Sequence, residues 1–98
     1  MLASEAIREA RNVLMQDGWC QGQSENDRGE KCMSGALAKV FLRDHVSRAA
    51  TTAATDCVRA ATIPQFPLWN DTPGRTIHEV LDAFDRAEKL ALIVEEEG

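Results

Sequence analysis

Cys32 is the residue with the clearest potential for chemistry, because it stands where a helix is expected to begin. A helix N-terminus favours the thiolate, and such a nucleophile also needs a base and a group that orients the base. The candidates for the base are His45 and His78. Asp71, or Asn70 beside it, could orient that base. This set predicts a cysteine-dependent enzyme as one alternative, whereas simple burial of Cys32 is the favoured interpretation.

Three cysteines, Cys20, Cys32 and Cys57, could also hold a zinc ion together with a histidine. Structural zinc sites usually take their ligands in pairs two to four residues apart, and no two of these cysteines are that close. We therefore expect no metal and no other cofactor. The odd number of cysteines and the absence of a CxxC pair favour reduced thiols over a disulfide framework.

The stretch WNDTPGRT, residues 69–76, is the main candidate for a binding loop. Arg75 would lie beside the free amides of a helix N-terminus, where phosphate or carboxylate is favoured. With Trp69, Asn70 and Asp71, Arg75 makes up the set of candidate binding residues. A structural interpretation of the same stretch competes with this one and is favoured.

In the structural interpretation, each part of WNDTPGRT builds the entry into a helix. Pro73 and Gly74 predict a type II turn, because proline fixes φ at its second position and glycine allows positive φ at its third. Thr76 and Glu79 predict a capping box at the start of the helix. A buried polar network would fix the loop geometry. The expected members of this network are Asn70, Asp71, Arg75, Trp19 and Gln21.

Apolar residues at helical spacing predict four helices, and no strand pattern competes with them. The helices are expected over residues 4–17, 32–44, 46–61 and 76–95. A polar loop, 19–31, and a Pro-rich connection, 63–75, join them. We therefore expect an all-α fold, a compact single-domain bundle of about four helices over residues 1–98.

The helix ends carry their own signals. Ser4 is expected to be the N-cap of the first helix. Gly35 is small enough to allow close backbone approach at the start of the second helix. Glu95, Glu96 and Glu97 oppose the negative end of the last helix dipole, so its final turn is expected to fray.

The Pro-rich connection is expected to be mostly extended. Ile63, Phe66 and Thr72 each precede a proline, which disfavours the helical region of the backbone. Trp69, with Phe66 and Leu68, is expected to anchor the connection to the core.

The predicted third helix presents a stripe of small side chains at helical spacing. Its members are Val46, Ala49, Ala50, Ala53, Ala54, Cys57, Val58 and Ala61. Internal packing of the whole stripe is favoured. Any exposed part would instead offer a close-approach surface to another helix, either in a homodimer or in a host partner.

Charge and hydropathy exclude several classes of protein. The net charge is -5, and the eleven basic residues are scattered among sixteen acidic ones. Direct nucleic-acid binding is therefore disfavoured, because it needs clustered Lys and Arg. An acidic surface could meet a basic partner. The sequence has no apolar stretch of membrane-spanning length and does not begin like a signal peptide, so we expect a cytoplasmic protein with no membrane association.

Three motifs carry a family resemblance: GWCQG (18–22), CMSGAL (32–37) and WNDTPGRTIHEVLDAFDRA (69–87). Together they resemble a small domain-of-unknown-function family of actinobacteria and their bacteriophages. The resemblance implies an accessory protein, located in the host cytoplasm if it is phage-encoded, and it brings no catalytic residues.

The expected function is therefore binding, not catalysis. We expect a small non-enzymatic accessory protein that engages a host or phage protein. The alternatives are the cysteine-dependent enzyme centred on Cys32 and a self-associating structural module.

Overall fold

The computed structural model describes residues 1–62 and 66–97, and in them it confirms the all-α class. The helices are α1 (Ala3–Asp17), α2 (Met33–Arg43), α3 (Arg48–Ala61), α4 (Phe66–Asn70) and α5 (Ile77–Glu97). Four of them are the predicted bundle helices, and α4 is one additional short turn of helix. Strands are absent from the described residues, where the only β-pairing consists of isolated bridges within the polar loop.

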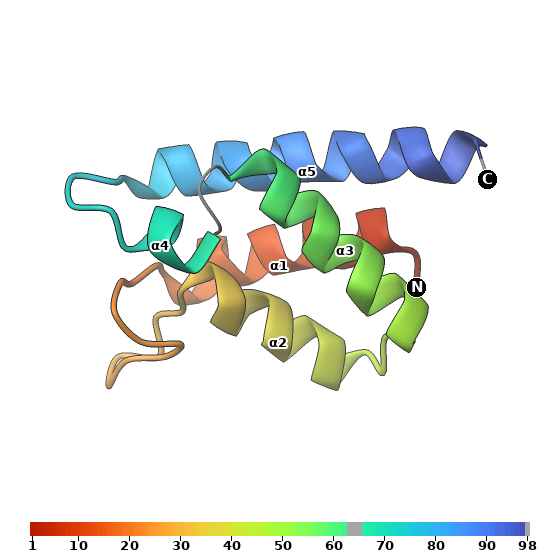
Figure 1. The fold of residues 1–98 in the computed structure, drawn as a ribbon. Helices are drawn as coiled ribbons and strands as arrows, with labels where there is room; N and C mark the ends of the chain where they lie inside the picture. The colour runs from red at the N-terminus through yellow and green to blue at the C-terminus, as the bar shows by residue number, and fades with distance from the viewer. Residues whose placement is uncertain (63–65, 98) are drawn as a thin grey trace.

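The first helix, α1, is the centre of the bundle, because it contacts α2, α3 and α5 (Figure 1). Its buried residues include Ile7, Ala10, Val13 and Leu14. Alanines alternate with these larger side chains, so three neighbouring helices can approach the same short helix.

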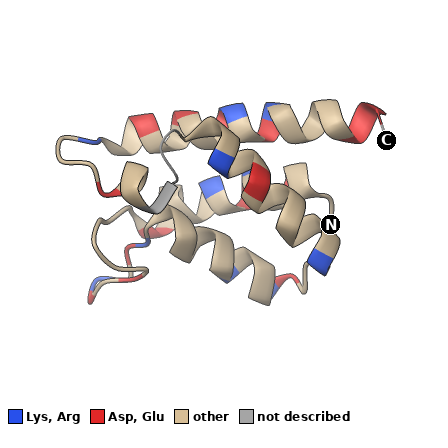
Figure 2. Cartoon of the chain, in the orientation of Figure 1, with Lys and Arg blue, Asp and Glu red and all other residues tan. Residues whose placement is uncertain are grey.

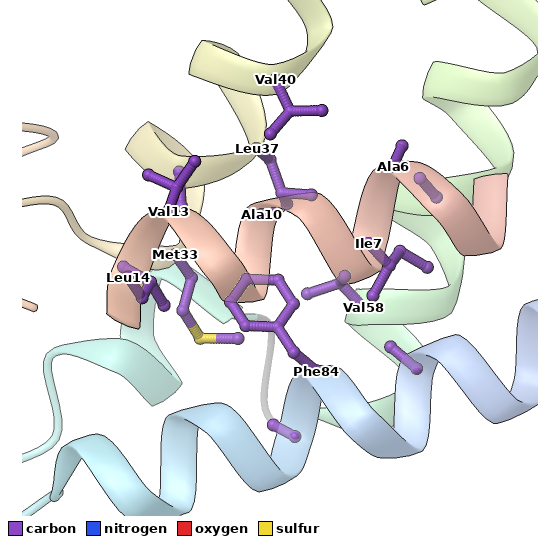
Figure 3. Packing of buried hydrophobic residues seen from close by; sticks show 14 of the residues in the cluster. Ala6, Ile7, Ala10, Val13, Leu14, Met33, Leu37, Val40, Val58 and Phe84 are labelled. Atoms are coloured by element: carbon purple, nitrogen blue, oxygen red, sulfur yellow. The ribbon is translucent and has the colours of Figure 1, made fainter. Parts of the chain in front are cut away.

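The core is centred on Phe84 of α5, which points into the bundle among Met33 and Val58 (Figure 3). Val80, Ala87 and Ala91 continue the same buried face of α5. The helical spacing of these residues predicted this face, and the burial confirms it. Burying one large apolar side chain stabilises the fold by about 1.5–3 kcal/mol, so a core with few aromatics depends strongly on Phe84.

Side-chain caps fix the starts of α2 and α3. The Cys32 sulfur accepts the amide of Gly35 at 3.4 Å, and α2 starts at the next residue after this cap. The Ser47 hydroxyl accepts the amide of Ala50 at 3.2 Å, which fixes the start of α3. The third helix therefore begins two residues later than its apolar pattern predicted.

The prediction that Ser4 caps α1 is wrong, because Leu2 is the N-cap and Ser4 lies buried in the first turn. The Glu95 carboxylate accepts from the Ser4 amide at 3.1 Å and from its hydroxyl at 2.6 Å. The last helix, whose final turn is expected to fray, is helical through Glu97 in the structure. Glu95 still opposes the negative end of its own helix, but its carboxylate gains a favourable interaction with the positive end of α1.

The connection before α5 is partly helical. Phe66 opens α4, so its predicted extended conformation is wrong, and proline is tolerated in the first turn that follows it. Trp69 is 8 % exposed and anchors the segment as predicted, whereas Leu68 is 69 % exposed and does not. Ile63, the other residue expected to be extended at the start of the connection, lies outside the described residues.

Within residues 1–62 and 66–97, no helix combines the length and apolarity that crossing a bilayer would require.

Candidate functional site

Three segments meet at one end of the bundle: the polar loop 19–31, the start of α2, and the stretch 69–76 (Figure 1). We call this end the loop junction. Most of the sequence-predicted site residues lie in it.

Asn70 is the centre of the loop junction and is 2 % exposed. Its Oδ1 accepts from the Trp19 indole at 2.7 Å and from the Met33 amide at 3.1 Å. Its Nδ2 donates to the Cys20 carbonyl at 3.2 Å and to the Asp71 carboxylate at 2.9 Å. One buried amide side chain therefore connects all three segments and uses its whole hydrogen-bonding capacity.

Gln21 and Asp71 extend this network towards the surface. Gln21 Nε2 donates to the carbonyls of Asn70 and Thr72, at 2.9 and 3.0 Å. The Asp71 carboxylate accepts from the amide of Gly22 at 3.0 Å. This backbone bond, followed by the bond from Asn70, lowers the pKa of Asp71. The predicted hydrogen bonds are thus confirmed for Trp19, Gln21, Asn70 and Asp71. Burial is confirmed only for Asn70, because Trp19 is half-buried and both Gln21 and Asp71 are exposed.

Arg75 belongs to a second cluster. Its Nε donates to the Trp69 carbonyl at 3.0 Å, and its guanidinium carbon lies 3.8 Å from the centroid of the Trp69 ring. Its Nη1 pairs with Glu79 at 2.8 Å. The Arg75 guanidinium is therefore already paired with neighbours within the chain. This pairing disfavours the interpretation in which Arg75 binds an anion.

The predicted turn and capping box are both confirmed. The Arg75 amide donates to the Thr72 carbonyl at 3.1 Å, and Gly74 adopts a φ of 85°. The Thr76 amide donates to the Glu79 carboxylate at 3.0 Å, and the Glu79 amide donates to the Thr76 hydroxyl at 3.3 Å. The Thr76 amide and then Arg75 lower the pKa of Glu79.

Gly35 is required where the polar loop lies on α2. A Cβ at this position would stand 2.0 Å from the Ser24 carbonyl oxygen, and the Cys32 amide donates to that same oxygen at 3.2 Å. The close approach expected from a small residue at the helix start is therefore confirmed, and its partner is the polar loop.

Lys31 is a site residue that the sequence did not reveal, because a lysine in a polar loop is normally exposed. It is 8 % exposed, and its ammonium lies 3.1 Å from Asp17 and 3.3 Å from Glu25. Lys39 also pairs with Asp17, at 2.8 Å. Hydrogen bonds from Lys39 and then Lys31 lower the pKa of Asp17. Ion pairs, as well as backbone hydrogen bonds, thus hold the polar loop against α1 and α2.

The structure brings only part of the proposed catalytic set together. Cys32 and Asp71 line the same cavity of about 220 Å³. His45 is exposed and follows the opposite end of α2, a helix about 16 Å long, and His78 is exposed in the first turn of α5. Neither histidine side chain makes a hydrogen bond or ion pair with another described residue. The base that a cysteine nucleophile needs is therefore not beside Cys32 in this structure.

The cysteines do not form a metal centre. Cys20 and Cys32 lie in the loop junction, whereas Cys57 lies on α3. Across the two described ranges, no group of three or more His, Cys, Asp or Glu residues is arranged to hold a metal ion.

A different surface lies at the opposite end of the bundle, where the start of α1, the first half of α3 and the end of α5 come together (Figure 1). They enclose a cavity of about 340 Å³, which we call the terminal groove. Its lining includes Leu2, Ala50, Ala53, Cys57 and Val94.

The small-residue stripe of α3 is divided between the core and the terminal groove. Ala54 and Val58 are fully buried, as the internal-packing interpretation predicted. Ala49 is exposed, and Ala50 and Ala53 are only partly buried. The exposed part therefore corresponds to the alternative interpretation, a surface open to another helix.

Acidic residues border the terminal groove at the end of α5 (Figure 2). Glu95 bonds to Ser4, and Glu96 and Glu97 are exposed. Among the described side chains, none of these three glutamates pairs with a Lys or Arg. This end of α5 thus combines exposed apolar residues with carboxylates that no described Lys or Arg pairs.

The fold and the two ends define a small all-α domain with an internally bonded loop junction and an open apolar groove. The chain belongs to a family of unknown function, DUF6197, whose profile matches residues 1–90. This match confirms the expectation of an uncharacterised domain family. No curated protein and no solved structure matches the chain significantly.

Proposed function

We propose that this chain is a small non-enzymatic accessory protein, of the kind that bacteriophages encode, which binds a host or phage protein in the terminal groove. The observation that carries the proposal is the open cavity of about 340 Å³ lined by Leu2, Ala50, Ala53 and Val94. Contiguous exposed apolar surface on a small domain is typical of an interaction site.

Several of the exposed large apolar side chains lie in or near this groove. Met1 is 51 % exposed and Leu2 55 %, while Ile93 and Val94 near the end of α5 are 53 % and 60 % exposed. Each large apolar side chain that leaves water on binding contributes about 1.5–3 kcal/mol before the entropic costs of association. In the loop junction, by contrast, the polar groups already bond to one another.

The partner that fits the groove best is an amphipathic helix with basic residues beside its apolar face. Ala49, Ala50 and Ala53 have no long side chains, so a helix backbone can approach α3 closely. Helix-in-groove recognition places a few large apolar side chains of the partner into such a cavity. Glu96 and Glu97 would then face its Lys or Arg residues.

A second copy of this chain fits the groove less well. A two-fold dimer uses the same patch on both subunits. It would therefore bring two sets of Glu95, Glu96 and Glu97 into one interface, where like charges repel. This charge pattern favours a basic partner over self-association.

The test uses a helical peptide with Leu on one face and Lys on the other, and a twin peptide with Glu in place of Lys. Binding is measured by fluorescence anisotropy with wild type and with Ala50→Glu. Ala60→Glu is the matched control, because Ala60 is exposed on the same helix and does not line the groove. We expect Ala50→Glu to weaken binding of the Lys peptide by about tenfold or more, equivalent to about 1.4 kcal/mol.

The control and the twin peptide decide the outcome. Ala60→Glu should leave Kd within about twofold, and the Glu peptide should bind much more weakly than the Lys peptide. Equal effects of Ala50→Glu and Ala60→Glu, or no binding by wild type, would contradict the proposal. A dimer on sizing that Ala50→Glu dissociates would identify a second copy as the occupant.

A further inference from the structure

The segments that contain Cys20 and Cys32 lie side by side in the loop junction. The Lys31 amide donates to the Gly18 carbonyl and the Cys20 amide to the Lys31 carbonyl, both at 3.0 Å. This pattern pairs Trp19 with Lys31 in parallel register, so the next opposing pair is Cys20 and Cys32. Neighbouring extended segments lie about 4.8 Å apart, within the range of about 4.4–6.8 Å between Cα atoms that a disulfide spans.

Asn70 gives independent evidence that the two cysteines are close. Its Nδ2 donates to the Cys20 carbonyl at 3.2 Å, and its Oδ1 accepts from the amide of Met33, the residue after Cys32, at 3.1 Å. A single amide group therefore bridges the two segments. Burial in this position and then the neighbouring Cys32 sulfur raise the pKa of the Cys20 thiol.

We propose that Cys20 and Cys32 are a redox modification site, at which exchange with an oxidised low-molecular-weight thiol forms a reversible intramolecular disulfide. This inference does not depend on the proposed function. The third cysteine, Cys57, is excluded from the site because it lies on α3 at the terminal groove.

The exchange takes two steps. The Cys32 thiolate, on the wall of the 220 Å³ cavity, attacks one sulfur of the oxidant, and the other sulfur leaves as a thiolate that takes up a proton. Cys20 then loses its proton and attacks the Cys32 sulfur of this mixed disulfide, which releases the second small thiol. In sum, two protein thiols lose two electrons and two protons, and the oxidant disulfide becomes two thiols.

The two cysteines differ in ways that fit this order. The Cys32 sulfur accepts the Gly35 amide and lines the cavity. The Cys20 sulfur donates to the carbonyls of Gln23 and Glu30, at 3.5 and 3.3 Å, and burial, which raises its pKa, favours the protonated thiol. A rotation about the Cα–Cβ bond of Cys20 exchanges these contacts for the disulfide.

The disulfide would fasten the polar loop to the start of α2. It closes a loop in the unfolded chain, which reduces the entropy of the unfolded state and stabilises the folded one. We therefore expect the oxidised protein to have a higher Tm than the reduced protein, and a reductant to reverse the change.

The test incubates the full folded chain with oxidised glutathione, followed by alkylation of free thiols and peptide mapping by mass spectrometry. We expect a single disulfide between Cys20 and Cys32, with Cys57 fully alkylated. Cys57→Ser should give the same product. In Cys20→Ser the reaction should stop at a glutathione adduct on Cys32, because the second attacking thiol is missing.

Wild-type mapping alone decides the question if a cysteine variant does not fold. A disulfide that involves Cys57, a mixture of all three pairs, or glutathione adducts without an intramolecular bond would each overturn the proposal. The same reaction in urea is the control for the unfolded chain, and it should lose the preference for the Cys20–Cys32 pair.

Discussion

The two ends of the bundle use their side chains in opposite ways. At the loop junction, the side chains of Trp19, Asn70 and Asp71 form hydrogen bonds with one another. Arg75 bonds to the Trp69 carbonyl and forms an ion pair with Glu79. At the terminal groove, large apolar side chains just before α1 and near the end of α5 remain exposed beside the alanines of α3. The most conspicuous motif of the sequence therefore builds structure, and a plain alanine stripe provides the open surface.

This difference predicts that substitutions at the two ends have different consequences. Changes in the loop junction should reduce the free energy of unfolding. Changes in the terminal groove should leave stability nearly unaffected and reduce binding.

The largest loss of stability is expected for Gly35→Ala. The new Cβ would collide with the Ser24 carbonyl oxygen, and because that atom belongs to the backbone, the polar loop must move away from α2. Overpacking of this kind costs about 3 kcal/mol. Urea unfolding measures the loss, with Ala38→Ser, an exposed position on the same helix, as the control. A stable Gly35→Ala protein with an unchanged urea midpoint would show that the loop contact is not tight.

The second-largest loss of stability is expected for Asn70→Ala. It should lower the free energy of unfolding by about 2–3 kcal/mol, because it leaves the Trp19 indole and the Met33 amide without their acceptor. Asn12→Ala is the matched control, since the Asn12 side chain donates to Glu9 on its own helix. The difference between the two variants in urea unfolding measures the contribution of the network. Equal losses of stability in Asn70→Ala and Asn12→Ala would mean that the network contributes little to the free energy of unfolding.

The loop junction should also be sensitive to acid. The folded-state pKa of Asp17 lies below its unfolded value, so its stabilisation is complete above about pH 4 and is lost as pH falls through the folded pKa. Asp17→Asn should therefore cost about 1 kcal/mol at pH 7 and less at pH 2.5. Urea unfolding at both pH values measures this difference, and an equal cost at both would contradict the ion-pair assignment.

The smallest effect on stability is expected at the terminal groove. Val94→Asn replaces an exposed side chain and should change the free energy of unfolding by less than about 0.5 kcal/mol. The same variant should weaken binding of the Leu/Lys peptide, because Val94 lines the groove. A large loss of stability would show that Val94 belongs to the core and not to a free surface.

Much of the fold could be predicted from the sequence because its signals are local. Helical spacing indicated four helices, and the capping box at Thr76 and Glu79 lies within four consecutive residues. The network around Asn70 was also predictable in part, since Trp19, Gln21 and Asn70 are polar or aromatic residues in otherwise turn-rich segments.

The features that the sequence did not predict depend on residues that are distant from one another in the chain. Ser4 does not cap α1, because it bonds to Glu95 at the other end of the sequence. The burial of Lys31 depends on Asp17, and the proposed pairing of Cys20 with Cys32 rests on a loop register that no single motif encodes. The terminal groove is formed by three helix ends, so only the folded arrangement reveals it.

The most direct test of the difference between the two ends is NMR chemical-shift mapping with the Leu/Lys peptide and the folded wild-type chain. We predict that amide shifts concentrate at the terminal groove, at Leu2, Ala50, Ala53 and Val94, and that Gly22 and Asp71 in the loop junction do not move. Shifts concentrated at Gly22 and Asp71, with an unperturbed groove, would contradict the assignment of binding to the terminal groove.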